Sequence, residues 1–149
     1  MDIFSSPFFV TKAKWDDGVP VIWIEYIFKW DETEEFNGSD DGWAVNWDTE
    51  EAYAEVTGCD SDMDIVRQAT GGMGIETDDD NSRGEAWAGL VPRDGDPFSA
   101  NGELTQSYCH TWGPSGPSIS FSVAYGAVSV SATPSSSSKY WHKTARSSY

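Results

Sequence analysis

Basic residues and long apolar runs are scarce in this sequence. The 149 residues include nine Lys and Arg against 25 Asp and Glu, which gives a formal net charge of −16. Phosphate repels an anionic surface, so we expect no nucleic-acid partner. No apolar run reaches the length of about 18 residues that a membrane-spanning helix needs, so we expect no membrane span. A length near 150 residues predicts one domain with a sizeable core.

Residues that commonly carry catalysis are also few. The two histidines, His110 and His142, lie far from any G-x-S-x-G serine elbow. Cys109 precedes His110, but adjacent residues of a strand point to opposite faces, so these two would not pair as nucleophile and base. The glycines of residues 71–74 have no lysine beside them, which argues against a phosphate-binding loop. The sequence therefore favours a protein that is not an enzyme.

The acidic composition indicates a habitat. A surface with this charge repels itself in dilute buffer and destabilises the compact state, whereas roughly 1 M salt shortens the Debye length to about 3 Å. The composition is rich in acid and poor in lysine, and it resembles that of secreted or virion structural proteins of haloarchaea. No motif is specific to one family. The resemblance implies a halophilic, extracellular or virion protein; the alternative is an ordinary acidic protein from a moderate environment.

The N-terminal residues bear on this location. Residues 1–4 contain no basic residue, and residues 7–10 are too short for the apolar core of a signal peptide. We therefore expect either a leader that this sequence lacks or release without one, as for a virion protein freed by lysis.

The cysteines allow one intrachain disulfide, between Cys59 and Cys109. Closing a loop of about 50 residues would stabilise the fold by about 4 kcal/mol in the chain-entropy model. The alternative is a pair of buried, reduced thiols. The sequence favours the disulfide, which would fit an extracellular or virion location.

Alternation with a period of two dominates the chain and predicts strands. Residues 8–15 alternate and are followed by a tight turn at Asp16–Asp17–Gly18. Residues 19–30 are apolar on one face and half apolar on the other, which is typical of a central strand or of one under a partner. Further strands are predicted at 43–47, 85–91 and 103–112. Residues 118–132 predict one strand bent at Gly126 or two strands in a hairpin.

Two segments, 49–57 and 60–70, are ambiguous, because helix-capping patterns compete there with strand patterns. The chain as a whole predicts an all-β fold. We expect an antiparallel β-sandwich, jelly-roll-like, or a barrel, with one or two short helices at most.

Charge is distributed unevenly along the chain. Every acidic residue lies at or before Glu103, whereas residues 104–149 contain three basic residues and no acidic one. We therefore expect a single β domain over residues 1–133 and, over 134–149, a serine linker with a basic, aromatic tail. Tyr140 and Trp141 in this tail are expected to pack against another element or another copy.

Carboxylates and aromatic residues supply the remaining candidate sites. Glu25 lies between Trp23 and Ile27 and could join Glu55 or Glu85 as a glycosidase pair. The alternate carboxylates of Asp60, Asp62 and Asp64 are the best candidates for a calcium site, calcium being the one cofactor considered.

The leading hypothesis is a non-enzymatic structural or interaction protein that self-assembles or binds a surface partner protein. Its interface would include Trp23, Glu25, Ile27, Tyr140 and Trp141. The alternative is a small carbohydrate-active enzyme or sugar-binding module that uses Glu25 and tryptophans on its strands.

Overall fold

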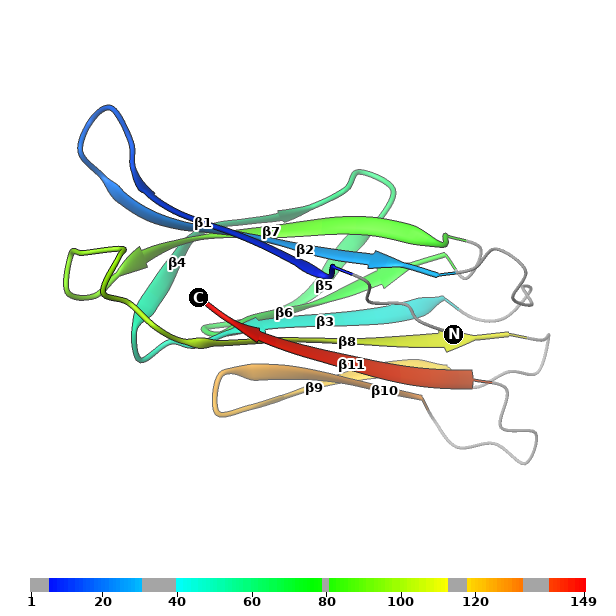
Figure 1. The fold of residues 1–149 in the computed structure, drawn as a ribbon. Coiled ribbons are helices and arrows are strands. Elements are labelled where there is room, and N and C mark those ends of the chain that lie inside the picture. Colours follow the sequence, from blue (N-terminus) through cyan, green and yellow to red (C-terminus); the bar gives the residue numbers. More distant parts are fainter. Residues whose placement is uncertain (1–5, 31–39, 79–80, 113–117, 133–139) are drawn as a thin grey trace.

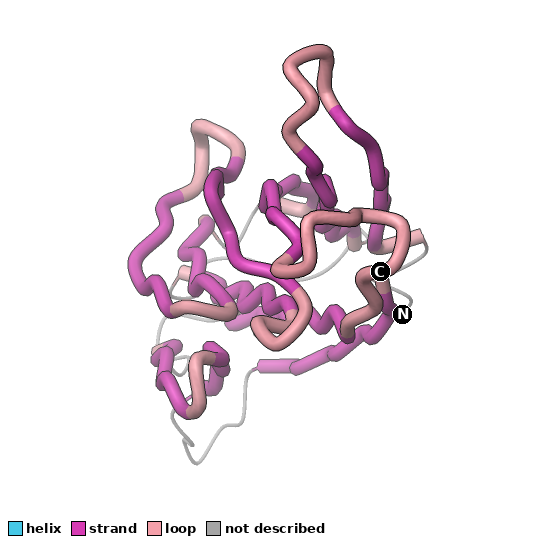
Figure 2. The backbone as a smooth tube through the Cα atoms, turned by 90° about the vertical axis from the view of Figure 1, so that its left-hand side faces the viewer, coloured by secondary structure: helices cyan, strands magenta, loops and turns pink. Residues whose placement is uncertain are grey.

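The computed structural model describes residues 6–30, 40–78, 81–112, 118–132 and 140–149, and these ranges contain strands, turns and loops but no helix (Figures 1 and 2). The prediction of an all-β fold is confirmed. The eleven strands are β1 (Phe8–Lys14), β2 (Pro20–Lys29), β3 (Asp41–Trp47), β4 (Ala52–Cys59), β5 (Asp64–Ala69), β6 (Gly72–Thr77), β7 (Arg83–Pro92), β8 (Glu103–Thr111), β9 (Ile119–Ala124), β10 (Ala127–Ala132) and β11 (Tyr140–Ser148). The two ambiguous segments form β4 and β5 with their preceding turns, so the strand alternative is the correct one in both and the described residues contain no short helix.

The strands form three antiparallel sheets. Sheet A has the order β1-β2-β7-β4, and sheet B has the order β11-β8-β3-β6-β5. Strands β9 and β10 form a separate hairpin. Figure 1 shows sheet A above sheet B and the hairpin below sheet B. Sheets A and B stay open at their edges, so the fold is a sandwich and the alternative of a closed barrel is wrong.

The main core lies between sheets A and B. The inward residues of β2 alternate along the strand, and Ile22, Ile24, Tyr26 and Phe28 are fully buried. Trp43, Val45 and Trp47 of β3 meet them from sheet B. The indole N–H of Trp43 donates to the side-chain oxygen of Gln106 at 2.8 Å, which satisfies a polar group that would be costly to bury alone.

The outer face of sheet B is covered by the hairpin β9–β10. Gly42 and Gly74 have no side chain, and their Cβ positions would fall within 3 Å of Phe121, Ile119 or Val130 atoms. The side-chain amide of Asn46 donates to the Val128 carbonyl at 2.9 Å and accepts from the Val128 N–H at 2.7 Å. The small residues of sheet B therefore allow close approach, and Asn46 fixes the hairpin in register.

The C-terminal residues correct one expectation. Residues 140–148, expected in a tail outside the β domain, form β11, which pairs antiparallel with β8 over its whole length. The stretch is aromatic at its start and alternates, which suits a half-buried strand. Its side chains divide between two layers, because Trp141 packs on the main core and Tyr140 packs on the side of the hairpin. The expected serine linker at 134–138 lies outside the described residues.

Candidate functional site

The outer face of sheet A carries the aromatic residues singled out by the sequence. Trp23, Glu25 and Ile27 of β2 point to this face, because they alternate with the buried Ile22, Ile24, Tyr26 and Phe28. Their neighbours in register on β7 are Gly89, Trp87 and Glu85, respectively. No other layer of the described chain packs on this face, whereas the hairpin covers the corresponding face of sheet B.

The indoles of this face lie across glycines of the neighbouring strands. The ring of Trp23 is 3.4 Å from the Cβ position of Gly89, and the ring of Trp87 fills the Cβ position of Gly58 on β4. Ring atoms at these positions lie low over the backbone of the neighbouring strand. Both tryptophans are partly exposed. Each indole is therefore partly covered by the neighbouring strand and partly open to solvent.

Hydrogen-bonding groups and further apolar side chains surround the two indoles. The indole N–H of Trp23 donates to the Glu25 carboxylate at 3.2 Å, which holds this carboxylate beside the ring. Phe9 of β1 lies opposite Glu25 in register and is 57% exposed, while Val56 of β4 is 48% exposed. A small apolar pocket of about 40 Å³ lies where Trp15, Trp23, Val56 and Val91 meet.

The three carboxylates proposed for a glycosidase are not gathered in one cleft. Glu25 and Glu85 are diagonal neighbours on the open outer face of sheet A, with Cα atoms about 7–8 Å apart. Glu55 lies at the bulge of β4 and lines both the small pocket beside Trp23 and the groove between β4 and β5. Glu85 lines a cavity of about 300 Å³ with Asp60, Lys29 and Arg83, and Glu25 is not among its lining residues. The described residues therefore do not place these carboxylates as an acid and a nucleophile around one substrate.

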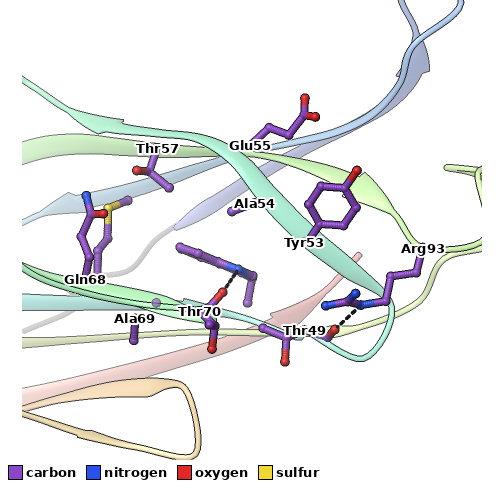
Figure 3. Close-up of a pocket in the computed structure, with 12 residues that line it drawn as sticks. Thr49, Tyr53, Ala54, Glu55, Thr57, Gln68, Ala69, Thr70 and Arg93 are labelled. Carbon is purple, nitrogen blue, oxygen red and sulfur yellow. Dashed lines mark hydrogen bonds between the residues drawn. The ribbon is translucent and has the colours of Figure 1, made fainter.

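A groove of about 340 Å³ lies where the edge strands β4 and β5 approach each other (Figure 3). Trp47 and Met73 of the core line it together with the polar side chains of Thr49, Thr57, Gln68 and Thr70. Arg93 donates from Nε to the Thr49 carbonyl at 2.8 Å and lies over the ring of Tyr53. Figure 3 shows Glu55 pointing away from Thr70 and Thr49. The groove belongs to the side of the sandwich where β4 and β5 end the two sheets.

The two sides of the sandwich differ in charge. On one side lie β1 and β11, since Lys12 of β1 is 5.9 Å from the ring of Tyr149, the residue after β11. These two strands contain no acidic residue and four basic ones: Lys12, Lys14, Lys143 and Arg146. On the other side, residues 48–69, which form β4, β5 and their turns, contain seven acidic residues and one basic residue.

The edges differ in regularity as well. Strands β1 and β11 pair with their neighbours in unbroken register. Strand β4 has a register shift between Ala54 and Val56, and β5 has one between Ile65 and Arg67. A bulge on an edge strand disfavours the addition of another strand, so the regular edges of this sandwich are its basic ones.

A buried polar cluster lies at one end of the core and was not found by the sequence analysis. The Asp41 carboxylate accepts from the Tyr108 hydroxyl at 2.6 Å and the Thr111 N–H at 2.9 Å. It also lies 2.8 Å from Nδ1 of His110. Burial raises the pKa of Asp41, and the hydrogen bonds with His110, Tyr108 and Thr111 oppose this. The signal was the alternation itself, since Asp41 is in phase with the inward Trp43 and Val45.

Aromatic rings close off this cluster from solvent. The imidazole of His110 is fully buried, with ring centroids of Trp30 at 4.6 Å, Trp141 at 5.2 Å and Trp112 at 5.7 Å. A substrate could not reach this histidine without opening the core. The cluster therefore holds β3, β8 and β11 together and is not a catalytic centre.

The expected disulfide is not formed. Both cysteines are free thiols, and sheet B separates them. Cys59 borders the core between the two sheets, while Cys109 packs against Val128 and Val130 on the hairpin side of sheet B. Burial raises the pKa of Cys109 to about 12, with the charge of Asp41 adding to the effect. Spacing along the chain did not reveal that the two side chains face different layers.

Two of the three aspartates proposed for calcium have structural partners at the β4–β5 turn, and the third, Asp64, is the first residue of β5. Asp60 accepts from the Glu85 N–H at 3.0 Å, and Asp62 accepts from the Asn81 amide at 3.3 Å. Among the described residues, no three His, Cys, Asp or Glu side chains are grouped closely enough to hold a metal ion. The same part of the chain contains no helix long and apolar enough to cross a membrane.

Comparison with known proteins gives one weak structural likeness. No family model matches the chain, and no curated protein matches it. A crystal structure of AggA, the major subunit of aggregative adherence fimbriae type I from Escherichia coli, is 11% identical over 94% of this chain and 92% of that chain, with a TM-score of 0.37. At this TM-score the likeness supports no inference about the function of this chain.

Proposed function

We propose that the protein is a non-enzymatic structural subunit that associates head-to-tail with copies of itself, outside the cell or in a virion of a halophile. One observation carries the proposal: the side of the sandwich formed by the edge strands β1 and β11 is basic, whereas the side formed by the edge strands β4 and β5 is acidic. A basic side and an acidic side on one chain can only meet between different copies. Such a contact is heterologous, and repeating it builds a chain of subunits or a ring.

Apolar side chains near both sides support this contact. Phe9 on β1 is 57% exposed, and Tyr53 on β4 and Val66 on β5 are 42% and 46% exposed. Charge pairs between exposed groups contribute little on their own and less in high salt. In this proposal, charge selects which sides meet, and the exposed apolar side chains supply most of the free energy.

The halophilic and extracellular parts of the proposal rest on composition. A net charge of −16 on 149 residues destabilises the folded state through self-repulsion, and molar salt screens this repulsion. The free thiols of Cys59 and Cys109 add no support for an oxidising compartment.

The particle mass tests the proposal. We expect light scattering to give masses above the 16.4 kDa monomer that rise with protein concentration, most clearly at the lowest KCl concentration at which the chain is folded. The double variant Lys14→Glu, Lys143→Glu should be monomeric, because it reverses charge on exposed residues of both basic strands.

The matched control is Lys29→Glu, Arg83→Glu, which reverses two exposed positive charges at one end of sheet A's outer face. It should assemble like the wild type. A monomeric wild type at all concentrations would refute the proposal, as would equal assembly of the two double variants.

A further inference from the structure

The outer face of sheet A has a ligand chemistry that self-association does not use. We propose that Trp23 and Trp87, which pack against Gly89 and Gly58, form a platform that binds a neutral oligosaccharide. The platform is defined by Trp23, Glu25, Glu85 and Trp87. The inference goes beyond the proposed assembly, because the four platform residues belong to β2 and β7, which are inner strands of sheet A and not its edges.

The position of the indoles is the first argument. Each ring occupies or touches a position that a Cβ would otherwise fill, and each tryptophan is partly exposed to solvent. Gly58 and Gly89 are diagonal neighbours on β4 and β7, which places the centres of the two supports about 7–8 Å apart. The two indoles therefore lie on the same face of the sheet, at a separation that one extended chain of sugar rings can bridge.

The chemistry of an indole face is the second argument. The face of an aromatic ring carries partial negative charge, and one side of a pyranose ring presents C–H groups with partial positive charge. Stacking of this kind needs a flat, accessible ring. An indole packed on its edge, or buried like Trp43, offers no such surface.

The carboxylates beside the rings are the third argument. Glu25 is held next to Trp23 by the indole N–H and has further lone pairs for accepting hydrogen bonds. Glu85 on β7 is the diagonal neighbour of Glu25 and is exposed. Sugar hydroxyls are donors that suit these acceptors, whereas an anionic polymer would be repelled. A second protein is less suited, because charged side chains are depleted at the core of protein interfaces.

Binding of defined oligosaccharides tests this proposal. Cellohexaose and chitohexaose are titrated into the protein in molar KCl, with tryptophan fluorescence and calorimetry as readouts. We expect saturable binding of at least one of them and reduced quenching of tryptophan by acrylamide. Trp23→Ala and Trp87→Ala should each weaken binding by about two- to tenfold, the scale of one aromatic stacking contact.

Two further variants test whether binding depends on the position of the indoles and not only on the presence of exposed aromatic residues. Gly58→Ala keeps both tryptophans but would place a Cβ where the Trp87 indole now lies, so it should weaken binding although no aromatic residue is lost. Phe98→Ala removes a side chain that is 68% exposed outside the platform and should leave binding unchanged. Thermal melts of each variant establish that it is folded.

The proposal is overturned if neither oligosaccharide binds the wild type, or if Phe98→Ala and Trp23→Ala bind equally. A fall in particle mass caused by Trp23→Ala would also overturn it, because the face would then be a contact between copies. Failure of assembly alone, with oligosaccharide binding intact, would refute the proposed function and leave this inference standing.

Discussion

Removal of the Asp41 carboxylate is expected to destabilise the fold more than the loss of any exposed acidic residue. Asp41 is the shared acceptor for the Tyr108 hydroxyl, the Thr111 N–H and the imidazole of His110, at 2.6–2.9 Å. All four residues are fully buried. Asp41→Ala deletes this acceptor and leaves a small cavity among the rings around it.

The magnitude follows from the number of donors. A buried donor that loses its partner costs about 1–3 kcal/mol, and breaking a buried charged contact typically costs about 3–5 kcal/mol. The desolvation that raises the pKa of Asp41 offsets part of the stability that its hydrogen bonds contribute in the wild type. We therefore expect Asp41→Ala to lower the free energy of unfolding by about 3–5 kcal/mol. This is a large share of the 5–15 kcal/mol that stabilises a typical domain.

The assay is urea unfolding in molar KCl, followed by tryptophan fluorescence. Asp41→Asn should cost about half as much as Asp41→Ala, because the amide keeps the shape and one acceptor oxygen. Asp78→Ala is the control, since it removes one exposed negative charge. If Asp41→Ala and Asp78→Ala differ by less than about 1 kcal/mol, the cluster does not stabilise the fold and this reasoning is wrong.

Two other predictions concern the thiols and the net charge. In the native chain, Cys109 should resist alkylation at pH 8, because its pKa is raised to about 12 and it is buried. In denaturant without reductant, both thiols should react; if no thiol reacts, the Cys59–Cys109 disulfide forms after all. The melting temperature should rise from low to molar KCl, because salt screens the repulsion that comes from a net charge of −16. A melting temperature that is flat or falls with KCl would contradict the halophilic interpretation.

Local patterns predicted the strands well where inward and outward residues alternate clearly along the strand. The alternation of residues 20–29 gives β2 almost to its ends, and the turn at Asp16–Asp17–Gly18 has the positive φ of 79° at Gly18 that such a turn needs. The hairpin β9–β10 turns at Tyr125 and Gly126, both with positive φ. Of the two alternatives predicted for residues 118–132, the hairpin is therefore the correct one.

Long-range pairing was beyond the reach of the sequence. The basic, serine-flanked residues 140–148 look like a tail until their partner, β8, is known. The Cys59–Cys109 pair fits every local rule, yet the two thiols lie in different layers. Asp41 stands in an acidic stretch typical of a surface loop, and only the pairing of β3 with β8 brings Tyr108 and His110 to it.

The place of β11 at the edge of sheet B has a consequence for protein synthesis. Domains begin to fold while the chain is being made, at about 5–20 residues per second, and β11 leaves the ribosome after all the other described strands. Until it does, β8 is an open edge, and the rings of Trp30, Tyr108 and His110 lack the Trp141 ring that packs on them in the native fold. An unpaired edge beside exposed aromatic rings is a site for aggregation, so a nascent chain of this protein is exposed to aggregation at β8 until β11 has docked.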